Sequence, residues 1–384
     1  MKRKHLWVCC LLIFSLLCFT ACGANGDGAS NETKEEAKQE VKVPDLKLSY
    51  IFTNHQTPLM VAVEKGETFK DSGVYLKEVV NRQKYILMKE ENPVANIELV
   101  VCKSGSETMT MMAQGHIDIA FASSAANISA IDKGTKVKML CPVHTEGIGL
   151  VVKKDAAVNN WEEFLTLIKE KKEPVKVGYH SPTSAPVILF EAALKKAGIS
   201  YTFDPEDLEK DILLVNVKGT TNLLPVLVSD QVDAWVGPSP YPELAETENV
   251  GKIILDMKHL PPEGEWYDFP CCVASATDKT IEENPVVLED LMKLMRVAAD
   301  YANEHKDEAA KITADFTGVS EEAAQKSSIK YTADPSETWV SNLGLVYDTL
   351  KKANKFSGSF VEKEYKDVQN DLFDFSFIKK ALDE

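Results

Sequence analysis

Short apolar segments of strand length alternate with segments of helical periodicity through most of the chain, and this alternation constrains the fold more than any other feature. Strands that alternate with helices assemble into α/β units, so the first series of elements predicts one α/β lobe. Its predicted elements are strands at Leu46–Phe52, Asn96–Cys102, Asp118–Ala122 and Val137–Val143, helices at Pro58–Lys65, Ser106–Gln114 and Ala125–Lys133, and a hairpin around Tyr75–Lys89.

The same alternation restarts after Gly149 and predicts a second lobe. Its predicted elements are strands at Leu150–Lys153, Val175–Tyr179, Ile212–Val217 and Asp233–Gly237, and helices at Trp161–Lys171, Ala185–Lys196 and Asn222–Val228. Two later strands, Lys252–Met257 and Phe269–Ala274, are expected to return to the first lobe, and the chain from Asp278 onward is predicted to be a helical C-terminal extension.

This pattern predicts an α/β protein of two lobes that are joined by two crossovers, with a ligand cleft between them. We expect residues 44–146 and 249–384 to form lobe 1 and residues 147–248 to form lobe 2. The hinges are expected near residues 145–148 and 248–251, where the chain would pass between the lobes.

The N-terminus has the layout of an export signal, because the basic residues Lys2, Arg3 and Lys4 precede a short apolar run. That run is shorter than the about 20 apolar residues that span a bilayer. It ends in Phe-Thr-Ala-Cys-Gly, which resembles the lipobox of bacterial lipoproteins. We therefore expect a signal peptide at 1–21, a lipid on Cys22, a disordered tether at 22–43 and a location on the extracytoplasmic face of the cell membrane. An ordinary secretory signal or an uncleaved anchor helix is the alternative.

The acidic balance, a net charge of −16, argues against a nucleic-acid partner. Four cysteines follow Cys22, and their spacing matches neither a zinc motif nor a CxxC redox motif. Cys102 and Cys141 could form a disulfide if their strands are neighbours, but buried free thiols are favoured. Cys271 and Cys272 are expected to alternate between the faces of one strand. The histidines are scattered along the sequence, so neither a metal site nor any other cofactor is predicted.

Candidate ligand-binding residues lie in four loops rich in glycine and hydroxyl side chains, each of which follows a strand and precedes a helix. Ligands bind at such carboxyl ends of strands in α/β sheets, and the free N–H groups of helix starts attract anions. Serine and threonine also cap helices, so capping alone is the alternative for any one loop. Four such loops, two in each lobe, favour a shared cleft. The candidates are Ser104, Gly105, Ser106, Ser123, Ser124, His180, Ser181, Thr183, Ser184, Gly219, Thr220 and Thr221.

Several segments together carry a family resemblance. They are Asn54-His55 with Pro58–Ala62 and Glu64–Gly66, Ser104–Ser106 with Met112–Gly115 and Ile117–Ala120, Gly178–Pro186, and Asp233–Val236 with Pro238. From about Leu46 to Val273 the chain resembles the nitrate, sulfonate and taurine type of ABC transporter solute-binding lipoprotein, a group that includes binders of thiamine-precursor pyrimidines. The chain departs from this group in residues 67–95 and in its helical C-terminus.

The resemblance implies a two-lobed periplasmic-binding-protein fold of type II, whose lobes close around a small solute. It implies an ABC permease and its ATPase as partners, and it adds Asn54, His55 and Pro238 to the candidate ligand-binding residues. We expect a monomer with no catalytic residue. An enzyme on the same fold and a ligand-sensing surface lipoprotein are the alternatives.

The class of solute is narrowed by which side chains are missing near the predicted cleft. Arg82 and Arg296 are the only arginines after Cys22, and neither falls in a cleft loop, so a bidentate arginine clamp is not expected. Trp266 and Tyr267 are candidates for a wall that stacks on a flat ligand. Hydroxyls and aromatic rings with few arginines suit a sulfonate-like monoanion or an uncharged heterocycle, and both remain open.

Overall fold

The computed structural model describes residues 42–383, which belong to one compact unit. The predicted signal peptide, Cys22 and residues 22–41 of the predicted tether lie outside the described residues. None of the helices in the described part is both long and apolar enough to span a bilayer.

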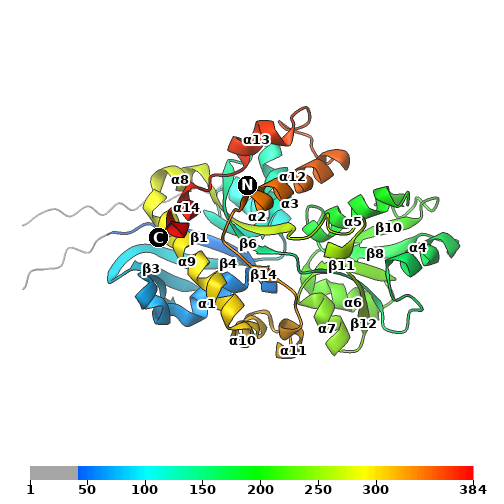
Figure 1. Cartoon of the computed structure of the whole chain (residues 1–384), viewed down its shortest axis with the longest axis horizontal. Coiled ribbons are helices and arrows are strands. Elements are labelled where there is room, and N and C mark those ends of the chain that lie inside the picture. Colours follow the sequence, from blue (N-terminus) through cyan, green and yellow to red (C-terminus); the bar gives the residue numbers. More distant parts are fainter. Residues whose placement is uncertain (1–41, 384) are drawn as a thin grey trace, which may run out of the picture. The chain divides into compact units, whose positions relative to one another are not determined.

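The first lobe is built on a mixed sheet with the strand order β14-β6-β13-β5-β1-β4-β3-β2 (Figure 1). β1 is parallel to both β4 and β5, whereas β13 runs antiparallel to β5 and β6. The strands of this sheet are β1 (Asp45–Ile51), β2 (Val74–Val80), β3 (Lys84–Lys89), β4 (Asn92–Cys102), β5 (Ile119–Ser123), β6 (Val137–Thr145), β13 (Pro270–Thr277) and β14 (Lys330–Tyr331). The predicted hairpin is confirmed as β2 and β3, which extend the sheet at one edge.

Three helices connect these strands as predicted, namely α1 (Thr57–Lys65), α2 (Gly105–Ala113) and α3 (Ser124–Asp132). Each begins directly after the carboxyl end of a strand or the short turn that follows it. The side chains of Ser104 and Ser123 accept hydrogen bonds from the first turns of α2 and α3, which fixes where these two helices start.

The second lobe has its own sheet with the strand order β12-β7-β11-β8-β10-β9, flanked by α4 to α7, and it is drawn in green in Figure 1. Its elements are β7 (Ile148–Lys153), α4 (Trp161–Glu170), β8 (Val175–Tyr179), α5 (Ala185–Lys196), β9 (Tyr201–Thr202), β10 (Ile212–Asn216), α6 (Leu223–Val228), β11 (Ala234–Pro238), α7 (Tyr241–Thr247) and β12 (Gly251–Asp256). β8 and α5 have the bounds that the sequence predicts. Trp235 is fully buried in the core of this lobe.

The predicted return of Lys252–Met257 to the first lobe is wrong. This segment forms β12, which pairs antiparallel with β7 in the second sheet. Only three residues separate the end of α7 at Thr247 from Gly251, so the chain turns back onto the sheet it has just covered. The second crossover therefore lies between β12 and β13 and not near residues 248–251. The first crossover runs between β6 and β7, as predicted.

Glu146 links the two crossovers. Its carboxylate accepts a hydrogen bond from Lys258 Nζ at 3.0 Å and another from the backbone N–H of Asp268 at 3.2 Å. Lys258 and Asp268 both lie between β12 and β13. The two passages of the chain between the sheets are thus held side by side.

The C-terminal part is helical, as predicted, apart from β14. Its helices are α8 (Asp278–Glu283), α9 (Pro285–Glu304), α10 (Lys306–Thr317), α11 (Glu321–Gln325), α12 (Glu337–Lys352), α13 (Tyr365–Leu372) and α14 (Ser376–Leu382). α9 packs on α1 and α14, and α12 packs on α3, so this extension covers the first lobe.

Candidate functional site

A small cavity of about 30 Å³ lies where the loops of the two lobes meet. The first lobe contributes residues from the end of β1 and the turn after it, from the start of α2, and from β5 and β13. The second lobe contributes residues that follow β8 and β10 and the last residue of β11. The cavity is lined by Ile51, Thr53, His55, Gln56, Gly105, Ser123, His180, Ser184, Ala185, Pro186, Thr220, Pro238, Cys271 and Cys272. Seven of these lining residues were predicted from sequence to contact a ligand.

Several predicted residues join the two lobes, and of these Ser123 also lines the cavity. Ser106 Oγ lies 2.8 Å from both Ser181 Oγ and Thr183 Oγ1. Ser123 Oγ donates a hydrogen bond to the Thr183 carbonyl at 3.2 Å. On the other side of the cavity, the Tyr241 hydroxyl donates to the Phe52 carbonyl at 3.0 Å. In this structure the lobes are therefore closed on each other.

Of the remaining candidates, some make hydrogen bonds near their own loop, and for the others the structure shows no contact with the cavity. Ser104 caps α2, and Ser124 Oγ donates to the Pro270 carbonyl at 2.5 Å. Asn54 is buried beside the cavity, and neither atom of its amide has a partner among the described residues. Gly219 precedes the short turn that holds Thr220, and Thr221 is exposed.

Trp266 and Tyr267 lie away from the cavity, contrary to their expected role as stacking walls. Trp266 is buried against Phe269 in the second crossover. Tyr267 is 40% exposed, and its hydroxyl donates to Glu263. Two neighbouring aromatic side chains suggested a surface on which a flat ligand could stack. The path of the crossover, which the sequence does not reveal, directs both rings away from the cavity.

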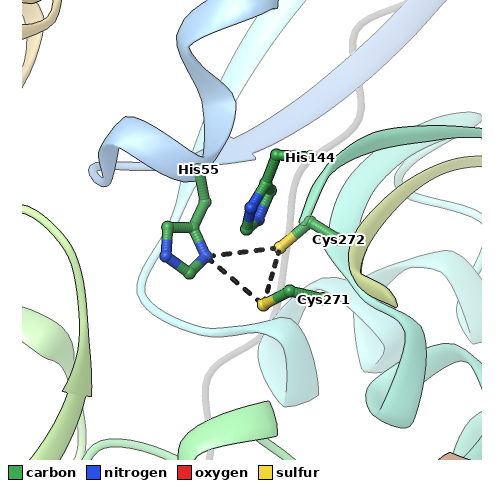
Figure 2. A group of neighbouring side chains, drawn as sticks. All are labelled: His55, His144, Cys271 and Cys272. Carbon is green, nitrogen blue, oxygen red and sulfur yellow. Dashed lines mark hydrogen bonds between the residues drawn. The ribbon is translucent and has the colours of Figure 1, made fainter. Parts of the chain in front are cut away.

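Four buried side chains with metal-binding chemistry meet at one wall of the cavity: His55, His144, Cys271 and Cys272 (Figure 2). Their donor atoms all lie within 4.8 Å of one another. His55 Nδ1 is 3.5 Å from Cys271 Sγ and 3.7 Å from Cys272 Sγ, and the two sulfurs are 4.0 Å apart. The ring centroids of the two histidines are 4.0 Å apart. We call these four residues the His-Cys cluster.

An irregular stretch of β13 brings the two neighbouring cysteines together. Side chains of a regular strand alternate between faces, which led us to expect Cys271 and Cys272 on opposite sides. The pairing of β13 with β6 shifts register on both sides of Cys272, as in a β-bulge. Both sulfurs consequently face the His-Cys cluster, and the expected alternation is wrong at this point.

Each histidine of the cluster has one ring nitrogen directed at a backbone carbonyl. His55 Nε2–H donates to the Gly147 carbonyl at 2.8 Å, which fixes the tautomer and leaves the Nδ1 lone pair facing the sulfurs. His144 Nδ1–H points at the Thr145 carbonyl at 3.3 Å. His144 Nε2 is buried and has no hydrogen-bond partner within residues 42–383, so it is the nitrogen available to a ligand.

Burial and close neighbours alter the protonation of the cluster. The hydrogen bond from Cys271, together with the neighbouring histidine rings, lowers the pKa of the Cys272 thiol well below its usual value. Burial, and then the adjacent Cys272, raise the pKa of Cys271. Burial and the nearby His55 ring lower the pKa of His144, which keeps that imidazole neutral. Imidazole nitrogens beside cysteine sulfurs form a set of donors suited to a soft or borderline metal ion.

The second lobe faces the His-Cys cluster with His180 and the start of α5. Burial, with a smaller effect of His55, lowers the pKa of His180 to about 3, so it is neutral at pH 7. Its Nδ1 and the side-chain amide of Gln56 lack hydrogen-bond partners among the described residues. Buried polar atoms in proteins are nearly always paired, so several unpaired ones around a single cavity indicate a place where a ligand binds.

The sequence argument against a metal site assumed that metal ligands would lie close together along the chain. The fold shows that this assumption is wrong. Residues 55, 144 and 271–272 lie on three separated segments that the first lobe brings together. One sequence feature could have predicted the His-Cys cluster. His55, His144 and the cysteine pair all lie at or near the ends of predicted strands, on one edge of the sheet. Cys102 and Cys141 are free and buried, as favoured, because three strands separate β4 from β6.

Comparisons with known proteins agree with this architecture. Residues 39–317 match the model of the NMT1-like family. A ligand-binding component of an ABC-type import system from Staphylococcus aureus with zinc bound has a TM-score of 0.68 at 16% identity, over 88% of this chain and 99% of that one. The nitrate-binding protein of Synechocystis PCC 6803 gives a TM-score of 0.68 at 15% identity, over 89% of each chain.

The alkanesulfonate-binding protein of Xanthomonas axonopodis pv. citri, bound to MOPS, gives a TM-score of 0.60 at 13% identity, over 82% of this chain and 96% of that one. An uncharacterised protein of Methanocaldococcus jannaschii is 36% identical over 156 residues, which is 40% of this chain and 98% of the relative. The structural matches give the two-lobed fold of the periplasmic binding proteins, and the match over residues 39–317 shows that the chain belongs to the NMT1-like family.

Proposed function

We propose that this protein is the extracytoplasmic solute-binding component of an ABC importer. It would be held at the membrane by a lipid on Cys22, capture a small solute by closure of its lobes and deliver the solute to a permease. The names of its structural relatives support this proposal, since they include a ligand-binding component of an import system and nitrate- and alkanesulfonate-binding proteins.

The observation that carries the proposal is the cavity lined by both lobes. His55, Gly105 and Ser123 come from one lobe, and Ser184 and Thr220 come from the other. A solute that touches both sets of residues favours the closed arrangement by its added contacts, and this shifts the population from open to closed. The linked crossovers at Glu146 and Lys258 would act as the hinge.

The lining of the cavity suits a compact, weakly charged solute. It contains no Asp, Glu, Lys or Arg side chain, and residues at the starts of α2 and α5 face it from opposite lobes. Helix N-termini favour anions through their free N–H groups. A small sulfonate-like anion is therefore the solute we favour over an uncharged heterocycle such as a pyrimidine. Either solute would need the lobes farther apart than in this structure, where the cavity is about 30 Å³.

A thermal-shift screen with sulfonates, nitrate, pyrimidines and aromatic acids tests the proposal. A ligand at about 100 times its Kd should stabilise the protein by about 2.7 kcal/mol. Ser184→Ala and Thr220→Ala should reduce this shift, because both side chains line the cavity. Thr221→Ala is the matched control, since Thr221 is exposed next to Thr220. Equal shifts in all three variants would place the solute elsewhere.

A further inference from the structure

We propose that the His-Cys cluster binds one zinc ion in a tetrahedral site with two nitrogen and two sulfur ligands. The ligands would be His55 Nδ1, a ring nitrogen of His144, Cys271 Sγ and Cys272 Sγ. Both cysteines bind the ion as thiolates, and any thiol proton still present leaves to solvent, so the filled site carries no net charge. This inference goes beyond solute capture, because zinc binding at the cluster depends neither on a permease nor on the transported solute.

The spacing of three of the four donor atoms matches a tetrahedron around zinc, and all four lie within 4.8 Å of one another. Zn–S bonds of about 2.3 Å and Zn–N bonds of about 2.05 Å give S···S edges of about 3.8 Å and S···N edges of about 3.6 Å. The observed separations are 4.0 Å between the sulfurs and 3.5 and 3.7 Å from His55 Nδ1 to the sulfurs. An ion can thus enter the cluster with shifts of a few tenths of an ångström at these three atoms.

The histidines are also oriented as metal ligands are. A histidine that binds a metal usually donates its other N–H to a carbonyl or carboxylate, which fixes the ring. His55 does so to Gly147 at 2.8 Å, and His144 directs its Nδ1 at Thr145. His144 Nε2 is fully buried and has no hydrogen-bond partner within residues 42–383. A bound ion would satisfy this atom, which otherwise costs the fold free energy.

The origin of the ligands determines how the ion would enter. All four ligands belong to the first lobe, so the site persists when the lobes separate. His180 and Ser184 of the second lobe lie across the same cavity. Lobe closure therefore shields the ion from water, and exchange of the ion requires opening.

A disulfide between the neighbouring cysteines explains fewer of these observations. A bond of about 2.05 Å would have to replace the 4.0 Å separation of the two sulfurs. It would also leave His55 Nδ1 and His144 Nε2 facing the cluster without a role. Zinc accounts for all four side chains together.

The test is a titration of the full chain, purified in mild detergent under a phosphine reductant and stripped with a chelator, with Co²⁺ as the spectroscopic probe. We expect one equivalent of Co²⁺ to give the intense visible bands of tetrahedral cobalt and a thiolate-to-metal charge-transfer band. One equivalent of Zn²⁺ should bleach both. A titration in which cobalt stays octahedral, without a thiolate band, would overturn the proposal.

Matched substitutions locate the site. Cys272→Ser and His144→Gln should weaken Zn²⁺ binding by more than about 100-fold, beyond the 10- to 100-fold loss typical of outer-shell changes. Cys102→Ser is the control, because Cys102 is also a buried free cysteine of the first lobe but its Sγ faces Met111. Zinc affinity that is unchanged in Cys272→Ser, or lost equally in Cys102→Ser, contradicts the assignment.

A second measurement needs no variant. Alkylation of the native protein, read by mass spectrometry, should be slowed by one equivalent of Zn²⁺ at Cys271 and Cys272 but not at Cys102. Equal protection at all three positions, or none, would count against the site. A protein that fails this test but still responds to a solute in the thermal-shift screen retains its proposed transport function, so the two proposals can fail separately.

Discussion

His55 connects the cavity with the hinge. Its Nδ1 faces both cysteines, while its Nε2–H donates to the carbonyl of Gly147 in the first crossover. Gly147 has a φ of +73°, and a Cβ there would lie 2.2 Å from a side-chain atom of Ile329. Only glycine fits this position without a shift of its neighbours, so the crossover and the His-Cys cluster are held in one geometry.

Glu243 provides a prediction about pH. Its Oε1 accepts a hydrogen bond from Ser239 Oγ at 2.7 Å, Oε2 has no partner among the described residues, and burial raises the pKa of the carboxyl above its usual value of 4.5. The native state then holds a proton that the unfolded chain has lost. Its stabilising effect is therefore complete below about pH 4.5 and disappears as the pH rises through the native pKa.

Glu243→Gln removes this charge and keeps an oxygen that can accept from Ser239. We expect a higher free energy of unfolding at pH 8, by about 1.4 kcal/mol for each unit by which the native pKa is raised, and little change at pH 4. Urea unfolding at both pH values measures this. Glu248→Gln in an exposed position makes the same charge change and should have almost no effect. A loss of stability in Glu243→Gln at pH 8 would show that the carboxylate is stabilising.

Single residues of the site differed in how well the sequence predicted them. Ser184 and Thr220 follow strands and precede helices, so local pattern was sufficient to place them at the cavity, whereas His55 was expected there only from the family resemblance. Cys271 and Cys272 were missed because a register shift in β13 reverses the side-chain alternation that the sequence indicates. His144 was missed because its partners are distant along the chain, and only the assembled sheet brings them together.

At the scale of elements, the end of α3 anchors the C-terminal extension. The buried carboxylate of Asp132 accepts hydrogen bonds from the backbone N–H groups of Ser357, Gly358 and Phe360 at 2.8–3.0 Å. A Cβ on Gly358 would lie 1.8 Å from the carbonyl oxygen of Asp132, so the loop approaches as closely as glycine permits. The extension is thus part of the first lobe's structure.

Asp132→Asn weakens these three hydrogen bonds, because the amide offers one acceptor oxygen in place of two charged ones. Bonds to charged groups contribute about 1.5–3 kcal/mol each, so we expect a loss of about 2–4 kcal/mol in the free energy of unfolding. Asp371→Asn, which removes only a partly exposed ion pair with Lys363, should cost less than about 1 kcal/mol. Chemical denaturation of the two variants compares them, and equal effects would contradict the anchoring role.

The helices and strands were largely predictable from sequence, but the sheet to which each strand belongs was not always predictable. β8 and α5 have the predicted bounds because alternation, an N-terminal Ser-Ala-Pro and a C-terminal glycine mark them. β12 was recognised as a strand but assigned to the wrong lobe. Its partner β7 is set by the direction of a three-residue connection after α7, and periodicity contains no information about that direction.

At the scale of the whole molecule, the closed arrangement depends on a few polar contacts between the lobes. Ser106→Ala removes the hydrogen bonds to Ser181 and Thr183, and two such bonds contribute about 1–3 kcal/mol. We expect the Kd of the solute to rise about tenfold, because binding must now supply that part of the closure free energy. Isothermal calorimetry measures the change.

Thr110→Ala is the control for Ser106→Ala. Among residues 42–383, the Thr110 hydroxyl bonds within α2 alone, to the Ser106 carbonyl at 2.9 Å. If both variants bind the solute as tightly as the parent, the contacts between the lobes do not contribute to capture.

Small-angle X-ray scattering of the full chain in detergent-matched buffer, with and without the solute identified by thermal shift, tests the central claim most directly. Lobe closure around the cavity predicts a smaller radius of gyration in the bound state and the closed profile calculated from residues 42–383. Ser106→Ala should shift the unbound profile further toward the open form. If the unbound protein gives an open profile and a saturating ligand leaves that profile unchanged, the result would contradict capture by closure.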